Sequence, residues 1–170
     1  MKNYPVAKPY ITAEDKKNVL AVLNTDDLSL GPKYREFEKK FAEKLGVKYG
    51  CAVSSGTAGL HLAMIACGIG EGDEVITAPF SFVASANAVL YVGAKPVFVD
   101  IDPLTYNLDP SKIEEKITKN TKAILAVHIF GQPCAMAPIM RLAKKYKLRI
   151  IEDACESIGA AYRGRPAGAA

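Results

Sequence analysis

Apolar positions along this chain follow two spacings that alternate. From residue 51 onward, short apolar runs of strand length take turns with longer segments in which apolar residues recur every three or four positions. The short runs predict strands at residues 51–53, 74–77, 96–99, 123–127 and 149–151. The longer segments predict helices at residues 58–67, 81–91 and 137–146, and a capping box predicts one more that opens at Ser111. Because these strands are too apolar for burial on one face only, the pattern predicts an α/β fold: a mostly parallel sheet with helices on both faces.

Two helices with no strand between them are predicted before residue 50. Residues 12–15 have the form of a capping box and predict the start of the first helix. Residues 24–30 form a predicted loop. The second helix follows the loop, because Phe37, Phe41 and Leu45 recur at a spacing of four.

The composition is that of a globular protein rather than a nucleic-acid-binding or membrane protein. Of the 170 residues, 49% are hydrophobic and 24% are charged, which suffices for one domain with a substantial core. The net charge of +4 comes from lysines and arginines scattered among acids, so we expect no nucleic-acid partner. We expect no membrane partner either, because no apolar run reaches transmembrane length and the N-terminus lacks the core of a signal peptide.

The cysteines favour a reducing compartment over a metal or disulfide site. The four residues Cys51, Cys67, Cys134 and Cys155 include no CxxC pair and no cluster with histidine at zinc spacing, so no metal site is predicted. Three of them lie in apolar stretches, where a free cysteine is usually a small buried hydrophobic residue. We therefore expect a cytoplasmic location.

Candidate chemistry gathers in three loops that follow predicted strands: residues 54–58, 79–82 and 152–156. In parallel sheets, ligands bind at the carboxyl ends of the strands. Small residues at 54–58 let backbone N–H groups approach an anion, which the dipole of the following helix favours. From this segment alone, a tight turn capped by Ser55 or Thr57 is the stronger interpretation, and it needs no ligand. Neither the Walker loop nor the G-x-G-x-x-G fingerprint is present.

The other two loops are also open to more than one interpretation. Asp153 is placed to pair with a protonated ring nitrogen, but a magnesium-binding carboxylate or a helix cap fits its position as well. The ring of Phe82 is placed to stack on a planar cofactor, although an aromatic residue near a helix start is more often part of the core. His61 is predicted to be structural, and His128 is either structural or part of the site.

Taken together, the three loops resemble one family. The resemblance is carried by SLGPKYREFEKKFAEKLGVKYGCAVSSGTAGLHLAM, by GEGDEVITAPFSFVASANAVLYVGAKPVFVDID and by AVHIFGQPCAMAPIMRLAKKYKLRIIEDACESIGAAYRGRPAG. These segments are similar to the DegT/DnrJ/StrS aminotransferases. The resemblance implies the fold-type I architecture of pyridoxal-phosphate enzymes, a homodimer, and transfer of an amino group from a donor such as glutamate to a nucleotide-linked keto sugar. It also implies an N-terminal arm and helix at residues 1–30 and an incomplete large, cofactor-binding domain at residues 31–170, without the C-terminal part of the family fold.

The resemblance assigns roles to six residues. Thr57 and Ala58, with Gly56 before them, match the positions whose backbone N–H groups hold the cofactor phosphate. Phe82 matches the aromatic residue that stacks on the pyridine ring, and Asp153 matches the acid that binds the ring nitrogen. Glu156 falls where the family usually has glutamine or histidine near the phenolic oxygen of the cofactor, and a carboxylate at this position is a departure.

The resemblance further implies that the Schiff-base lysine lies beyond residue 170, so we expect the 170-residue chain to be inactive by itself. Three alternatives to an aminotransferase stay open. The first is a pyridoxal-phosphate-dependent sugar dehydratase of the same fold, with histidine at the lysine position. The second is a non-catalytic binding or assembly fragment. The third is a generic nucleotide-binding domain, which the absence of its glycine fingerprints disfavours.

Overall fold

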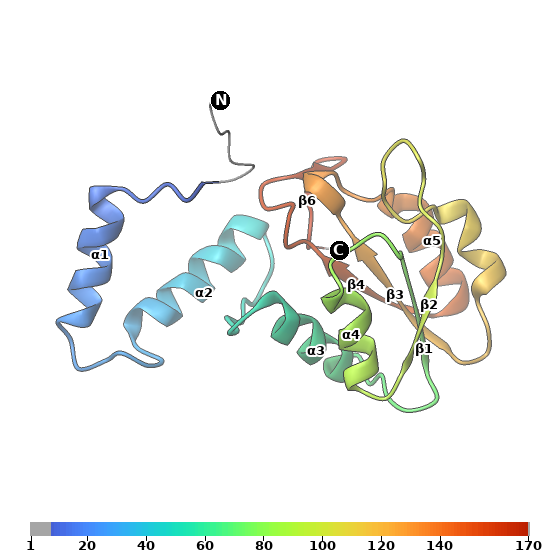
Figure 1. Ribbon diagram of the computed structural model, residues 1–170, viewed down its shortest axis with the longest axis horizontal. Helices are drawn as coiled ribbons and strands as arrows, with labels where there is room; N and C mark the ends of the chain where they lie inside the picture. The colour runs from blue at the N-terminus through green and yellow to red at the C-terminus, as the bar shows by residue number, and fades with distance from the viewer. Residues whose placement is uncertain (1–7, 170) are drawn as a thin grey trace, which may run out of the picture. The chain divides into compact units, whose positions relative to one another are not determined.

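The structure is a computed structural model that describes residues 8–169 (Figure 1). The chain divides into two compact units. One comprises the described residues up to 44 together with 48–52, and the other comprises residues 45–47 and those from 53 onward. The second unit contains the sheet.

The first unit is built around the two predicted helices, α1 (Ala13–Leu23) and α2 (Pro32–Leu45). The predicted capping box of α1 is present: the N–H of Asp15 donates to Thr12 Oγ1 over 3.1 Å, and the N–H of Thr12 donates to Asp15 Oδ2 over 2.7 Å. This reciprocal pair satisfies two amides that the first helical turn leaves without partners.

The prediction of a strand at residues 51–53 is wrong. A strand needs a neighbouring strand for its backbone hydrogen bonds. The backbone of Ala52 is bonded instead by side chains of α2, since its N–H donates to Glu38 Oε1 over 2.8 Å and its carbonyl accepts from the Tyr34 hydroxyl over 2.9 Å. The segment is therefore not part of the sheet.

The second unit confirms the predicted α/β fold. Its four-stranded sheet has the order β2-β1-β3-β4, and every neighbouring pair of strands is parallel. The strands are β1 (Glu74–Thr77), β2 (Lys95–Phe98), β3 (Thr121–Val127) and β4 (Arg149–Asp153). Sheets of this kind are covered on both faces, because each parallel connection crosses over one face.

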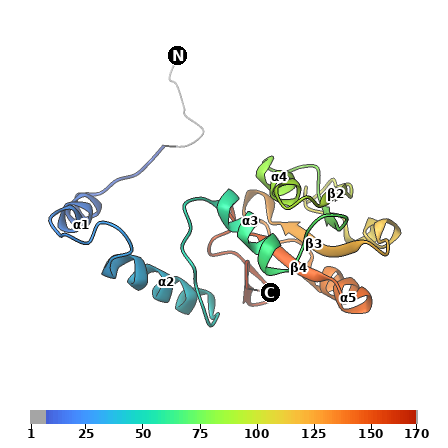
Figure 2. The same cartoon turned by 90° about the horizontal axis from the view of Figure 1, so that it is seen from below.

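Helices cover both faces of this sheet (Figure 2). Alternate side chains of β1, β3 and β4 enter two different cores. On one face, α3 (Gly56–Ala66) and α4 (Ala84–Tyr91) pack on the side chains that share the face of Val75. On the other face, α5 (Met136–Tyr146) packs on those that share the face of Ile76. Both Val75 and Ile76 are fully buried, which explains why the strands lack the alternation of a half-exposed sheet.

The prediction of an α-helix opening at Ser111 is also wrong. Two 3₁₀ turns, η1 (Pro110–Lys112) and η2 (Glu114–Lys116), occupy this segment. The side chain of Asp109 accepts hydrogen bonds from the backbone and hydroxyl of Ser111 at 2.9 and 2.7 Å, so the expected capping residue is itself capped. Ile113 is nevertheless fully buried in the core beneath α5.

Smaller differences concern boundaries. The helix predicted from residue 81 begins at Ala84, and the strand predicted at 149–151 extends to Asp153. The structure adds a short antiparallel pair, β5 (Ala161–Tyr162) and β6 (Arg165–Pro166), and a further 3₁₀ turn, η3 (Ile129–Gly131).

Candidate functional site

A cavity of about 280 Å³ lies at the carboxyl edge of the sheet, within the second unit. Its wall contains the last residues of β3 and β4, the first residues of α3 and the loop that follows β1. Five of the six residues to which the family resemblance assigned cofactor binding line it: Gly56, Thr57, Phe82, Asp153 and Glu156. The sixth, Ala58, is not among the lining residues.

The amide of Ala58 is occupied by the cap of its own helix. Its N–H donates to the Ser55 hydroxyl over 3.1 Å, so Ser55 is the N-cap that the sequence offered as one alternative. Within residues 8–169, the N–H groups of Gly56 and Thr57 make no hydrogen bond. They lie at the wall of the cavity at a helix N-terminus, where the partial positive charge favours an anion.

Gly56 packs closely against Cys155. A Cβ atom at this position would lie 2.8 Å from the Sγ of Cys155, a distance that real Cβ atoms do not adopt. The start of α3 therefore packs directly against the side chain of Cys155, which would have to shift to admit a larger residue at position 56. This approach brings the amides of the helix and the end of β4 to the same cavity.

Asp153 is the last residue of β4, and its side chain is buried, with the residue 7% exposed. One carboxylate oxygen accepts from Ser85 Oγ over 2.9 Å, and the other accepts from the backbone N–H of Cys155 over 3.3 Å. Both donors are neutral, and no lysine, arginine or histidine of the described chain forms an ion pair with this carboxylate. A buried anion of this kind suits a cationic ligand group.

A chain of serine hydroxyls supports Asp153, and the sequence did not reveal it. Ser85 has one hydroxyl proton, which goes to Asp153, so in the 2.7 Å contact between Ser81 and Ser85 the donor must be Ser81. Both serines lie near the start of α4, and Ser85 is fully buried. The signal available in the sequence was the run SFVAS, in which two serines four apart share one helix face.

Two more predicted residues of the cavity wall, Phe82 and Glu156, differ in exposure and in hydrogen bonding. The ring of Phe82 is 74% exposed and is not part of the core, so the structural alternative for this residue is not realised. Glu156 is already engaged, because its Oε2 accepts the backbone N–H of Phe130 over 2.7 Å. Glu156 therefore holds the loop after β3 at the rim of the cavity.

The two histidines have different surroundings. His128 lines the cavity and is fully buried. Its Nδ1 accepts the backbone N–H of Cys134 over 3.0 Å, so in the neutral ring Nε2 carries the proton and donates to Glu152 Oε2 over 2.8 Å. The ring of His61 packs against Tyr91 on the neighbouring helix, with centroids 5.5 Å apart, as expected for a structural histidine.

Burial was expected for three of the four cysteines and is confirmed for one: Cys134 is buried and Cys67 is partly buried, whereas Cys51 and Cys155 are exposed. Cys155 lines the cavity beside Asp153. Although the residue is exposed as a whole, partial burial of its sulfur, and then the hydrogen bond to the Asp153 carboxylate, raise the pKa of the Cys155 thiol to about 11. The group therefore stays protonated at neutral pH.

Comparison with known proteins decides which family the chain represents. The sequence profile of the DegT/DnrJ/EryC1/StrS aminotransferase family matches residues 9–170. The chain belongs to this family. The resemblance that the three loops carried is thereby confirmed, and so is the fold type.

Relatives of this aminotransferase family member include a GDP-perosamine synthase from Caulobacter vibrioides, which is 49% identical over 96% of this chain and 44% of its own length. A putative sugar aminotransferase from Streptococcus pneumoniae, solved in its PMP form, superimposes with a TM-score of 0.93 at 29% identity, covering 98% of this chain and 46% of the other. The DesI protein, solved in the presence of its TDP-sugar product, superimposes with a TM-score of 0.84 at 38% identity, covering 91% and 40%. The chain thus spans less than half the length of these relatives.

Two further observations concern metal ions and membranes. Residues 8–169 contain no group of three or more histidine, cysteine, aspartate or glutamate side chains arranged to hold a metal ion. None of the helices in the same range is long and apolar enough to cross a membrane.

Proposed function

We propose that this family member holds pyridoxal phosphate in the cavity at the carboxyl edge of the sheet. In this proposal it takes part in moving an amino group from an amino acid such as glutamate to a nucleotide-linked keto sugar. One observation carries the proposal: Asp153, a buried carboxylate without a cationic partner in the described chain, faces the same cavity as the unpaired amides of Gly56 and Thr57. The printed names of the relatives, a GDP-perosamine synthase and a protein with a TDP-sugar product, support the choice of substrate class.

The lining residues fit the two charged ends of such a cofactor. The first amides of α3 suit a phosphate, because they are unpaired donors at a helix N-terminus. Asp153 suits a protonated ring nitrogen, whose charge its buried carboxylate would balance. When bound, the cofactor supplies an electron sink for the reaction, and a protonated ring is the better sink.

The remaining residues would orient the ring. Phe82, at the exposed mouth of the cavity, offers an aromatic face against which a planar ring can stack. The hydroxyl chain from Ser81 through Ser85 fixes the Asp153 carboxylate, so its free lone pairs keep one direction. Glu156 has one oxygen engaged with Phe130, which leaves Oε1 as the atom that could contact a ligand.

A titration of the purified protein with pyridoxamine phosphate tests the proposal. The ring nitrogen is labelled with ¹⁵N, and its chemical shift reports whether the bound ring is protonated. We expect a protonated ring at pH 7.5 in the wild-type protein and a neutral ring in Asp153→Asn, because an amide cannot balance the pyridinium charge. The matched control is Asp26→Asn, an exposed aspartate in the loop after α1, which should leave the shift unchanged.

Two results would contradict the proposal. One is the absence of saturable binding of pyridoxamine phosphate by the wild-type protein. The other is a bound ring whose protonation is the same in the wild-type protein and in Asp153→Asn.

A cytoplasmic location is part of the same proposal. All four cysteines are free, which is usual for proteins of reducing compartments.

A further inference from the structure

Three exposed aromatic rings meet beside the cavity, and none of the roles proposed above uses them. Phe80 comes from the loop after β1, Tyr106 from the loop after β2 and Phe130 from η3, after β3. The centroid of the Phe80 ring lies 5.6 Å from that of Tyr106 and 5.8 Å from that of Phe130. The three side chains are 41%, 48% and 73% exposed, respectively. We call this group the aromatic platform.

Two members of the platform have a strained backbone. Tyr106 has a φ of 60° and Phe130 a φ of 52°, in the left-handed region that residues with a bulky side chain rarely adopt. Such conformations persist only where the surrounding structure enforces them, and they concentrate at functional sites. Aromatic residues held in this way by the fold indicate that the placement of the two rings matters.

The loop of Phe130 is held from both sides. The buried amide of Asn107 accepts the N–H of Ile129 over 3.0 Å and donates to the carbonyl of Gln132 over 2.9 Å, so it spans the turn that carries Phe130. Glu156 accepts the N–H of Phe130 itself. Since Glu156 also lines the cavity, the platform and the candidate cofactor site share a wall.

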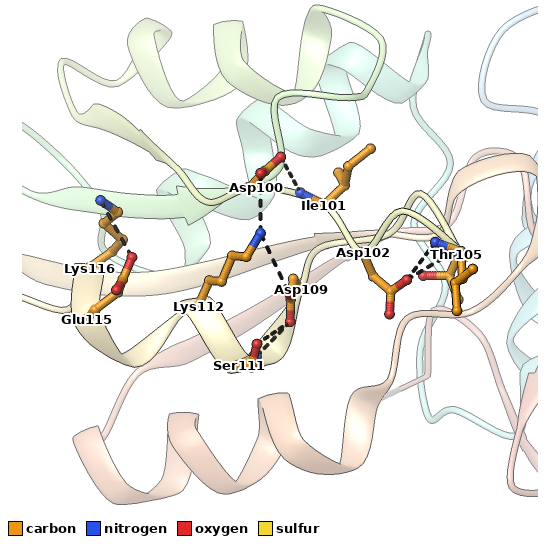
Figure 3. Close-up of polar contacts among 10 residues, drawn as sticks. Asp100, Ile101, Asp102, Thr105, Asp109, Ser111, Lys112, Glu115 and Lys116 are labelled. Carbon is orange, nitrogen blue, oxygen red and sulfur yellow. Dashed lines mark hydrogen bonds and ion pairs between the residues drawn. The ribbon is translucent and has the colours of Figure 1, made fainter.

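The loop of Tyr106 is held by acidic side chains (Figure 3). The Oδ1 of Asp102 accepts the N–H groups of Leu104 and Thr105 at 2.7 and 3.3 Å, which closes the turn before Tyr106. Lys112 forms ion pairs with both Asp100 and Asp109, at 3.3 and 3.8 Å, and so ties the two ends of the loop together. The backbone that carries these two rings is therefore held in place by the protein itself, which lowers the entropy cost of binding.

We propose that the aromatic platform stacks the heterocyclic base of the nucleotide that carries the sugar substrate. The inference rests on the proposed function, because it assigns the base end of that substrate to a surface that adjoins the cavity. Stacking on an aromatic side chain suits every nucleobase, since each base presents a π face. A diphosphate and a ribose separate the base from the sugar, so a base on the platform lets the sugar reach the cavity. Three rings are too few for a stable protein interface, which takes about 20–30 residues on each side.

The test measures binding of GDP to the purified protein by calorimetry, with ribose 5-phosphate and inorganic pyrophosphate as probes that lack the base. We expect Phe130→Ala to weaken GDP binding about tenfold, which is near the lower end of the affinity loss that follows removal of one stacking ring. Phe130→Gly serves as a second variant, because glycine adopts the φ of this position freely and keeps the loop in place while removing the ring. The matched control is Leu104→Ala, a residue of the Tyr106 loop that is 88% exposed. Binding of the base-free probes should not depend on Phe130.

A direct reporter is available because the chain contains no tryptophan. Phe130→Trp places a single fluorophore in the platform, and stacking of guanine should quench its emission. Ribose 5-phosphate should leave the emission unchanged.

The outcomes separate this inference from the proposed function, because the same variants are also titrated with pyridoxamine phosphate. If pyridoxamine phosphate binds normally while GDP fails to bind, or binds Phe130→Ala and Phe130→Gly as tightly as the wild type, the platform proposal is overturned and the cofactor proposal stands. If both variants weaken GDP binding but the wild-type protein does not bind pyridoxamine phosphate, the platform proposal is supported and the cofactor proposal fails. If the variants change only the sedimentation coefficient, another protein surface covers the rings, and the platform proposal is overturned.

Discussion

At the scale of single residues, the least expected member of the site is Cys155. Its sulfur fills the space that a side chain at Gly56 would need, and its backbone N–H bonds Asp153. One residue thus links the start of α3 to the end of β4. The raised pKa of its thiol, about 11, follows first from burial and then from the neighbouring carboxylate.

This environment predicts slow and pH-dependent alkylation of Cys155. Only the thiolate reacts. With a pKa of about 11, roughly a thousandth of the Cys155 thiol is ionised at pH 8, so the rate should rise about tenfold for each pH unit up to pH 10. Saturating pyridoxamine phosphate should suppress the reaction, because Cys155 lines the proposed cofactor cavity. The measurement is peptide mass spectrometry after timed exposure to iodoacetamide.

Cys134 provides the internal control for this experiment. It is buried and burial raises its pKa to about 12, so it should stay unmodified while the protein is folded. Rapid modification of Cys155 at pH 8, or a rate that pyridoxamine phosphate leaves unchanged, would show that its surroundings or the location of the site are wrong.

At the scale of elements, the site depends on where helices begin. The N-cap of α3 decides which amides are left for a ligand, since Ser55 occupies Ala58 and leaves Gly56 and Thr57 unpaired. The start of α4 carries the serines that orient Asp153. Helix starts and strand ends thus meet at one edge of the sheet, as parallel topology requires.

The cap of α3 predicts a measurable loss of stability. Ser55→Ala should lower the free energy of unfolding by about 1 kcal/mol, because the amide of Ala58 loses its hydrogen-bond partner. The control is Ser54→Ala, since Ser54 is exposed and precedes the cap. Urea unfolding followed by circular dichroism gives both values. Equal stability of the two variants would mean that the cap contributes nothing.

The sequence predicted elements well where the signal was periodic and failed where the outcome depended on distant partners. The strand ending at Val127 was predicted because a parallel strand covered on both faces is apolar throughout. Residues 51–53 form a similar apolar run, but the backbone of Ala52 is hydrogen-bonded to side chains of α2 and not to a neighbouring strand. At Ser111 the capping-box pattern was present in the sequence. The side chain of Asp109 binds the backbone N–H of Ser111, however, and two 3₁₀ turns form in place of an α-helix.

The residues of the site, like the elements, could be predicted only in part. Its three loops were predictable, since parallel strands deliver their carboxyl ends to one edge, and five of the six assigned residues lie around one cavity. The supporting contacts were not predictable. Ser85 is one of many serines in the sequence, and only the fold brings it to Asp153, 68 positions away. The occupied amide of Ala58 depends on which of two candidate residues caps the helix.

At the scale of the whole molecule, the first unit leaves much apolar surface uncovered. None of the side chains of α1 is buried. A groove of about 560 Å³ between α1 and α2 is lined by Val19, Val22, Leu23 and Phe37, together with polar residues. Contiguous apolar surface of this kind usually marks an interaction site.

We therefore predict that the protein self-associates through α1 and α2 at micromolar concentrations, in keeping with the homodimer that the family resemblance implies. Val19→Glu should shift the population toward monomer, because it places a charge on the apolar wall of this groove, and Val19 is 60% exposed, so the helix itself loses no core contact. Lys17→Glu is the matched control, since it introduces the same side chain at a polar position of the same helix. Sedimentation velocity over a range of concentrations distinguishes the species. A wild-type protein that stays monomeric throughout the range would contradict the prediction. Equal association of Val19→Glu and Lys17→Glu would contradict it too, because charge rather than apolar contact would then control assembly.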